Sequence, residues 1–135
     1  MLHFGQAGLG LPDRDYYFKT DEATVAIQNA YKKYLTTLVA LSAQNDAEKK
    51  AEIVYAIETK LAASHKTRIE RRDIKANYNK MNVADLTKNN ANIGWSTLLT
   101  QLNQKAEAID IEQPAYYNKL NELLVSIPLQ DWKTY

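Results

Sequence analysis

Few residues of this 135-residue chain have the types and spacing that catalysis requires. The sequence contains two histidines, His3 and His65, which lie far apart, and no cysteine. No His-Glu-x-x-His motif is present, so a zinc site would need carboxylates for most of its ligands. For His65 we favour an interaction with the end of a helix. We therefore expect no metal site and no cofactor within this chain.

The sequence motifs of other enzyme classes are also missing. We find neither a Gly-x-Ser-x-Gly nucleophile motif nor a glycine-rich phosphate loop, and Gly8-Leu9-Gly10 is only part of a loop. Asp13 and Asp15 flank Arg14, and two carboxylates this close can form an acid–base pair. Nothing else in the sequence supports such a pair and we favour a solvated or ion-paired loop, so we predict no catalytic residue.

Charge gives no reason to expect a nucleic acid. Residues 65–80 carry six lysines or arginines, but Glu70 and Asp73 interrupt them and lie where they can pair with the arginines. The whole chain has 17 basic and 16 acidic residues. No apolar run approaches the ~20 residues of a membrane span. We expect no nucleic acid as a partner and no membrane segment within this chain.

The spacing of apolar residues predicts helices. Asp21 is a suitable N-cap for a helix ending between residues 42 and 45. A capping box of Asn45 and Glu48 predicts a second helix, to about Ser64. The apolar face expected for the first helix is Ile27, Tyr31, Tyr34, Leu38 and Leu41, widened by Ala23, Ala30 and Leu35. The face expected for the second helix is Ala47, Ala51, Val54, Ile57 and Leu61.

One carboxylate, Glu58, falls on the apolar face of the second helix. A buried carboxylate is costly unless it is paired or hydrogen-bonded. We therefore expect an arginine partner, either Arg71 or Arg72.

The rest of the chain predicts shorter helices joined by extended links. Thr67 and Glu70 form a second capping box, for a helix to about Asn77. Further helices are expected over residues 83–88, 95–106 and 114–127, with an extended link at 109–112 and a new helix after Pro128. The apolar face of the 114–127 helix is expected to be Tyr117, Leu120, Leu124 and Ile127. Because that last helix has barely begun at Tyr135, we expect a cut chain.

These elements predict an all-α fold, an irregular multi-helix bundle with short extended links. We expect a single helical domain over 1–135: a loop-rich segment over 1–19, a helical core over 20–106, and a C-terminal helix with a truncated next helix over 107–135.

The segment Gly8–Tyr17, GLGLPDRDYY, resembles the neprilysin and endothelin-converting-enzyme family of zinc metallopeptidases. The resemblance continues in the same order along the whole chain. Its further segments are Glu58–Ala62, Arg71–Asp73, Tyr78–Met81, Trp95, Pro114–Tyr117 and Leu129–Tyr135.

The resemblance implies that this chain is part of the N-terminal, non-catalytic helical domain of such an enzyme. In the family, the zinc motif lies downstream, in a thermolysin-like catalytic domain, and the helical domain admits only peptides of modest size. The resemblance thus implies zinc in the parent enzyme, no metal or catalytic residue here, and an extracytoplasmic parent that is periplasmic, secreted or membrane-tethered. The absence of cysteine fits a bacterial relative. The structural or interdomain candidates are Arg14, Asp15, Tyr16, Tyr17, Glu58, Arg71, Arg72, Asp73 and Tyr78.

Three functional hypotheses follow. The leading one is a helical lid segment of a neprilysin-like zinc metalloendopeptidase that cleaves peptides, inactive alone, whose partners are the downstream catalytic domain and peptide substrates. The second is a stand-alone helical protein-interaction module. The third, a complete small hydrolase, requires chelator-sensitive cleavage by this chain alone.

Overall fold

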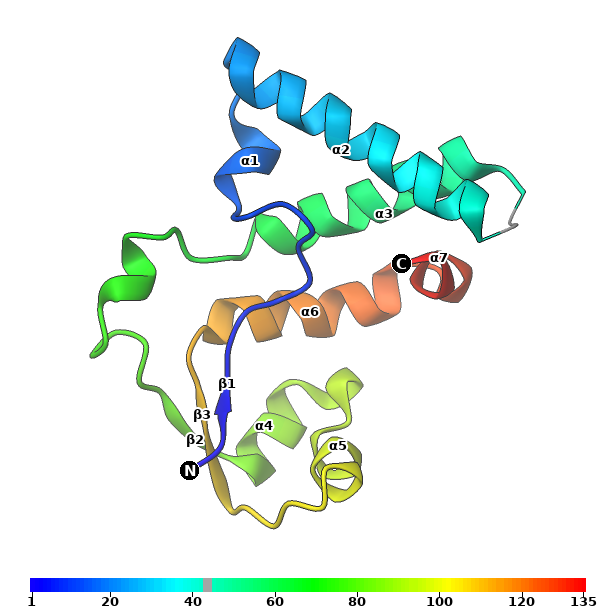
Figure 1. Ribbon diagram of the computed structural model, residues 1–135. Helices are drawn as coiled ribbons and strands as arrows, with labels where there is room; N and C mark the ends of the chain where they lie inside the picture. Colours follow the sequence, from blue (N-terminus) through cyan, green and yellow to red (C-terminus); the bar gives the residue numbers. More distant parts are fainter. Residues whose placement is uncertain (43–44) are drawn as a thin grey trace. The chain divides into compact units, whose positions relative to one another are not determined.

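The computed structural model describes residues 1–42 and 45–135, which form two compact units (Figure 1). The sheet unit comprises Met1–Ala7 and Ser64–Ile127, and the helix unit comprises Gly8–Ala63 and Pro128–Tyr135. Seven α-helices in the described ranges confirm a mostly helical fold. The single-domain organisation stays a prediction.

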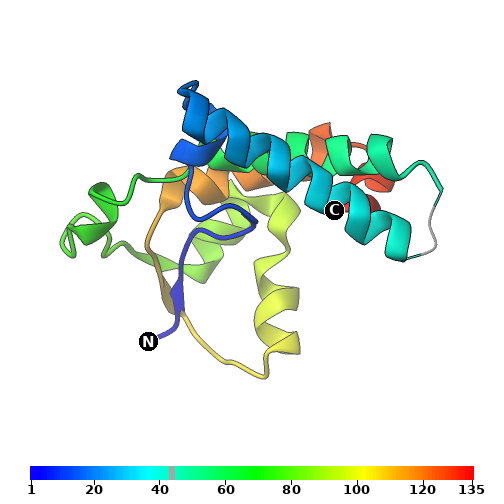
Figure 2. The same cartoon turned by 45° about the horizontal axis from the view of Figure 1, so that its top comes forward.

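The helix unit contains α1 (Asp15–Phe18), α2 (Glu22–Leu41), α3 (Ala47–Ala62) and α7 (Leu129–Thr134). Figures 1 and 2 show α2 and α3 lying side by side. Asp21 caps α2 as predicted, because its Oδ2 accepts a hydrogen bond from the Thr24 amide at 3.0 Å. Of the range predicted for the end of α2, residues 43 and 44 lie outside the described residues.

The predicted capping box at the start of α3 is wrong. The N-cap is Asp46, which adopts a left-handed backbone conformation with φ 59° and makes no side-chain capping bond. The predicted apolar face of α3 is confirmed in its central part. Ala51, Val54, Ile57 and Leu61 are all buried.

The predicted apolar face of α2 is buried only in part. Of its members, Leu35 is buried and Tyr31 is half-buried, and both pack against Ala51, Val54 and Tyr55 of α3. Because α3 meets α2 along this line, the rest of the predicted stripe points elsewhere. Its exposed members are Ile27, Tyr34, Leu38 and Leu41.

The sheet unit contains a three-stranded sheet that the sequence did not predict. The strands are β1 (His3–Phe4), β2 (Lys80–Asn82) and β3 (Ala108–Ile111), in the order β1-β3-β2. β1 pairs parallel to β3, with His3 opposite Asp110, and β2 pairs antiparallel to it, with Met81 opposite Ile109. The extended link predicted around Ile109 is therefore the central strand.

The helical elements of this unit are η1 (Glu70–Arg72), α4 (Val83–Asn89), η2 (Ala91–Ile93), α5 (Trp95–Gln101) and α6 (Pro114–Ser126). Trp95 is completely buried, and its ring contacts those of Phe4 and Tyr117 with centroids 5.5 and 5.3 Å away. α5 ends at Gln101, before the predicted Ala106. Of the face predicted for α6, Tyr117 and Ile127 are buried, whereas Leu124 is exposed. Tyr116 and Leu123 are buried as well.

The helix predicted over residues 67–77 is only one 3₁₀ turn, η1. The Thr67–Glu70 capping box is confirmed: the Glu70 carboxylate accepts from the Thr67 amide at 2.7 Å, and the Thr67 hydroxyl accepts from the Glu70 amide at 3.2 Å. The buried Asn77 side chain donates to the Glu70 carbonyl at 2.9 Å, which is the acceptor that a helix continuing through Ile74 would use. Such side-chain bonds compete with helical hydrogen bonding.

Candidate functional site

Glu58 organises the helix unit as a buried carboxylate. Its side chain is on α3, and the residue is only 5% exposed. Oε1 accepts hydrogen bonds from the Gly10 amide at 3.1 Å and the Tyr31 hydroxyl at 2.9 Å, and Oε2 accepts one from the Tyr17 hydroxyl at 2.8 Å. The predicted arginine partner is wrong, because uncharged donors from a loop, α1 and α2 satisfy the carboxylate. We call Gly10, Tyr17, Tyr31 and Glu58 the Glu58 latch.

The Glu58 latch explains the glycines of the loop before α1. A Cβ atom at Gly10 would overlap the Tyr31 hydroxyl, so only glycine lets the backbone approach the carboxylate. Gly8 adopts a φ of 85°, and its carbonyl accepts from the Tyr135 hydroxyl at 2.7 Å. The Leu11 amide donates to the Tyr17 hydroxyl at 3.0 Å. The loop is therefore held at three successive points.

The tyrosines of the Glu58 latch are structural donors. Burial raises the pKa of both Tyr17 and Tyr31 well above the ordinary tyrosine value, and the hydrogen bond to Glu58 raises each pKa further. Both hydroxyls therefore stay protonated near neutral pH. The two tyrosines therefore act as hydrogen-bond donors that stabilise the fold.

The predicted candidates beside Tyr17 occupy α1 and its N-terminus. Asp13 is not arranged as a catalytic partner of Asp15, because its Oδ1 accepts from the Asp15 amide at 2.9 Å. Asp15 lies 3.7 Å from Lys19, and the Arg14 guanidinium lies over the Phe18 ring at 5.7 Å. Tyr16 is half-buried and packs on the core that contains Leu11, Tyr17 and Ala62.

In the sheet unit, a second buried carboxylate connects the three strands. Asp110 of β3 is buried; its Oδ1 accepts from the Asn79 amide at 2.7 Å and its Oδ2 accepts from His3 Nδ1 at 2.8 Å. Buried Gln113 follows the same strand, and its Oε1 accepts from the Gln6 amide at 2.7 Å. Neither residue was predicted from the sequence, although Asp110 stands between two isoleucines as Glu58 stands between apolar residues.

The remaining candidates lie on the loop before β2. Arg71 and Arg72 are exposed, and with Arg68, Glu112 and Gln113 they line a pocket of about 260 Å³. Asp73 Oδ1 accepts from the Ala76 amide at 3.0 Å, and Tyr78 is exposed. The structure thus brings Tyr17 and Glu58 together in one unit, and Arg71, Arg72 and Asp73 together in the other.

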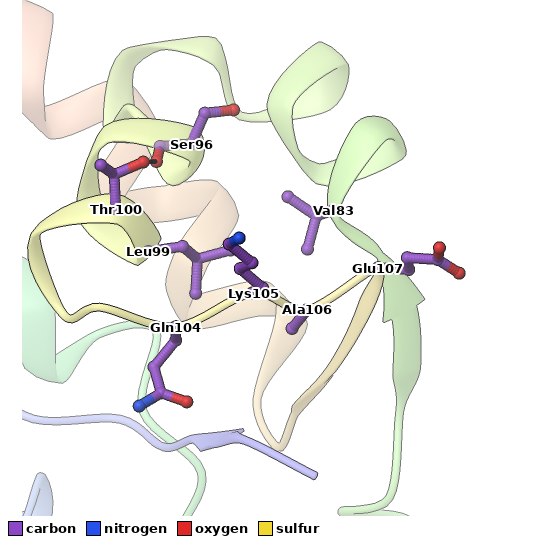
Figure 3. Close-up of a pocket in the computed structure, with 8 residues that line it drawn as sticks. All are labelled: Val83, Ser96, Leu99, Thr100, Gln104, Lys105, Ala106 and Glu107. Carbon is purple, nitrogen blue, oxygen red and sulfur yellow. Dashed lines mark hydrogen bonds between the residues drawn. The ribbon is translucent and has the colours of Figure 1, made fainter.

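A larger pocket of about 620 Å³ lies between α4, α5 and the segment leading to β3 (Figure 3). Figure 3 shows Leu99, Val83 and Ala106 on its apolar side, with Lys105 and Glu107 along the connecting segment. The Thr100 hydroxyl donates to the Ser96 carbonyl at 2.8 Å. Its lining residues include no histidine or cysteine.

The described residues do not fit a zinc ion. Among residues 1–42 and 45–135, no three His, Cys, Asp or Glu side chains gather closely enough to hold a metal. His3 is bound to Asp110, and His65 is buried, with Nε2 donating to the Ala7 carbonyl at 3.1 Å and its ring against Tyr116. Both histidines therefore serve the packing of the sheet unit. None of the described helices is both long and apolar enough to cross a membrane.

Comparison with known proteins identifies the family. The model of peptidase family M13, in its N-terminal part, matches residues 1–135. The chain belongs to peptidase family M13. Endothelin-converting enzyme-like 1 of Rattus norvegicus is 28% identical over 134 residues, 95% of this chain and 17% of that protein. Endothelin-converting enzyme 1 of Cavia porcellus is 30% identical over 88% of this chain and 16% of that protein.

A solved M13 structure has the same fold. The Mycobacterium tuberculosis zinc metalloprotease ZMP1 in its open state aligns with a TM-score of 0.84 and 32% identity, covering 98% of this chain and 21% of that protein. The predicted resemblance to neprilysin and endothelin-converting enzymes is confirmed. The chain spans about a fifth of the length of these M13 relatives, and it matches the N-terminal part of the family.

Proposed function

We propose that this chain is a helical lid segment of a neprilysin-like zinc metalloendopeptidase, where it restricts which peptides reach the active site, and that it is inactive alone. One observation carries the proposal. Almost the whole chain superposes on a fifth of a zinc metalloprotease, yet its described residues contain no group of three that fits a metal. In the parent enzyme, zinc held by residues outside this chain supplies the hydrolytic chemistry.

A lid of this kind acts by steric exclusion. The lid must keep its shape when a large peptide contacts it, and closing the lid removes water from the active site of the parent enzyme. Buried, fully hydrogen-bonded polar groups hold such a shape because opening them exposes several unsatisfied donors at once. The Glu58 latch joins a loop and three helices in this way. Its geometry supports a structural role and gives no support to a chemical one.

Peptidase assays of the isolated chain test the proposal that it is inactive alone. The 135-residue chain is purified, supplied with zinc and incubated with fluorogenic peptides, with ZMP1 as a positive control. We expect no chelator-sensitive cleavage and no stoichiometric zinc. Cleavage that a chelator abolishes and zinc restores, with a chain purified free of other peptidases, would establish the complete small hydrolase instead.

A stand-alone helical interaction module is the second candidate. The exposed apolar side chains of α2 favour it, since Leu41 is 78% exposed and Tyr34 and Leu38 are also exposed. The same side chains suit contact with the catalytic domain of one parent chain. The gene sequence beyond the codon for Tyr135 distinguishes the two: a downstream His-Glu-x-x-His motif supports the lid segment, and a stop codon supports the module.

A further inference from the structure

The loop between residues 66 and 79 of the sheet unit is fixed from within. The Lys66 ammonium donates to the Ala76 carbonyl at 3.0 Å and to Asn77 Oδ1 at 2.9 Å. The Lys66 amide donates to Gln6 Oε1 at 2.7 Å, and Asn77 Oδ1 also accepts from Gln113 Nε2 at 3.3 Å. A loop tied this closely loses little further freedom when it binds a partner.

The acidic residues of this loop are engaged with the loop itself. The Glu70 carboxylate accepts from the amide and the hydroxyl of Thr67, both at 2.7 Å, and Asp73 accepts from the Ala76 amide. Arg71 and Arg72 are exposed, and neither guanidinium forms an ion pair within the described part of the chain. The positive charge of the two arginines is thus available to a ligand.

These arginines meet at a pocket with a fixed floor. Arg68, Arg71 and Arg72 line it with Glu112 and Gln113, so three basic residues and one acidic residue border the pocket. Gln113 is 2% exposed, and its Oε1 is held by the Gln6 amide. The volume of about 260 Å³ is below the ~300–1,000 Å³ of pockets that enclose small molecules. It suits a single anionic group with a few neighbouring atoms.

Large apolar side chains of the same loop are exposed beside these arginines in the sequence. Ile69 is 79% exposed and Ile74 is 84% exposed. Contiguous exposed apolar side chains mark surfaces that bind other molecules, and arginine is enriched at protein interfaces. A free inorganic anion would gain nothing from the two isoleucines.

We propose that the Arg68–Arg71–Arg72 pocket binds a carboxylate of a peptide, with Ile69 and Ile74 contacting apolar side chains next to that carboxylate. Guanidinium groups bind carboxylates through paired, charge-assisted hydrogen bonds. Glu112 in the wall repels a dianionic phosphate more strongly than a singly charged carboxylate. This inference does not depend on the proposed lid function, because it concerns binding by the chain itself.

Calorimetric titration of the full 135-residue chain at low salt tests the proposal. The first probe is a peptide of alternating glutamate and leucine with both termini blocked. The second replaces every glutamate by glutamine, the third is the glutamine peptide with a free C-terminus, and the fourth is inorganic phosphate. The test variant is Arg71→Ala/Arg72→Ala. The control variant, Lys33→Ala/Lys60→Ala, removes the same charge from exposed positions of the helix unit.

We expect the glutamate peptide to bind, at least tenfold more tightly than the blocked glutamine peptide. The arginine variant should weaken binding at least tenfold, and the lysine control less than threefold. Binding of the free-C-terminus peptide with the same arginine dependence also supports the proposal and makes the terminal carboxylate a second source. Binding of phosphate alone, equal binding by the arginine variant, or no binding by either carboxylate peptide would overturn it.

Discussion

Replacing Glu58 by glutamine tests whether the Glu58 latch stabilises the helix unit. Glutamine has nearly the same shape, so the packing is preserved. Its amide oxygen can take the place of Oε1 and still accept from Gly10 and Tyr31. Its amide nitrogen then faces the Tyr17 hydroxyl in place of Oε2, and that hydroxyl loses its acceptor.

The magnitude follows from these three bonds. Hydrogen bonds to charged groups contribute about 1.5–3 kcal/mol each, against about 0.5–1.5 kcal/mol for neutral pairs. With one bond lost and two weakened, Glu58→Gln should lower the free energy of unfolding by about 2–4 kcal/mol. Glu58→Leu leaves all three donors without their acceptor and should cost about 3–5 kcal/mol. Glu52→Gln, at an exposed position of the same helix, is the control and should change stability by less than about 0.5 kcal/mol.

Urea unfolding gives the change in free energy, and hydrogen exchange locates it. Amides of α2, α3 and the loop around Gly10 should lose protection. A double-mutant cycle with Tyr17→Phe should show coupling, because both substitutions remove the same hydrogen bond. If Glu58→Gln unfolds at the same urea concentration as the parent chain, or if the cycle is additive, the carboxylate does not hold the unit together.

Three further predictions concern glycine, pH and tyrosine. Gly10→Ala should lower the free energy of unfolding in urea by about 2–3 kcal/mol, because its Cβ meets the Tyr31 hydroxyl. Gly94→Ala has open space around its Cβ and should lower it only by the ~1 kcal/mol of a left-handed backbone. Equal decreases for the two variants would contradict this prediction. The Thr24 hydrogen bonds lower the pKa of Asp21, so the carboxylate stabilises the folded chain above its unfolded pKa and stops doing so as pH falls through its folded pKa. Asp21→Ala should therefore be less stable than the parent chain at pH 7, and the difference in stability between the two chains should narrow at acid pH. A difference that stays constant with pH would refute the cap. Because the pKa of Tyr17 and of Tyr31 is raised, their contribution to folding stability is present below the unfolded pKa of about 10 and is lost as pH rises further. Absorbance at 295 nm should show these two tyrosines ionising only as the chain unfolds. Ionisation before unfolding would argue against their burial.

The elements that sequence reasoning predicted well depend on neighbours in the chain. The α2 helix follows from the Asp21 cap and a regular apolar spacing, both of which act within a few residues. The Thr67–Glu70 capping box was found for the same reason. Its continuation into a helix was wrong because Asn77, seven residues further on, bonds to the Glu70 carbonyl.

The sheet escaped prediction because its strands are too short to show alternation. β1 has two residues and β3 four, and pairing between them joins His3 to Asp110 across almost the whole chain. Asp110 is buried because it accepts hydrogen bonds from elements that are distant in sequence. Only the folded structure brings those donors together.

For the candidate site, the sequence predicted the burial of Glu58 but not its partners. Its place among apolar residues was sufficient for the first inference. The donors come from Gly10 and Tyr31, 48 and 27 positions away. A glycine gives no sign in the sequence that its amide binds a carboxylate, and Tyr31 was assigned only to an apolar face.

The proposed role of this segment in selecting peptides by size is tested most directly by cleavage of a peptide length series. The full parent enzyme is compared with its Glu58→Leu and Glu52→Gln variants, on peptides that share one cleavage site and differ only in flanking length. A lid segment that has lost the Glu58 hydrogen bonds should admit longer peptides. Glu58→Leu should therefore raise kcat/KM for the longest peptides and leave kcat/KM for the shortest unchanged, while Glu52→Gln should behave as the parent enzyme. An unchanged length profile in a Glu58→Leu enzyme whose helix unit has lost hydrogen-exchange protection would contradict the account.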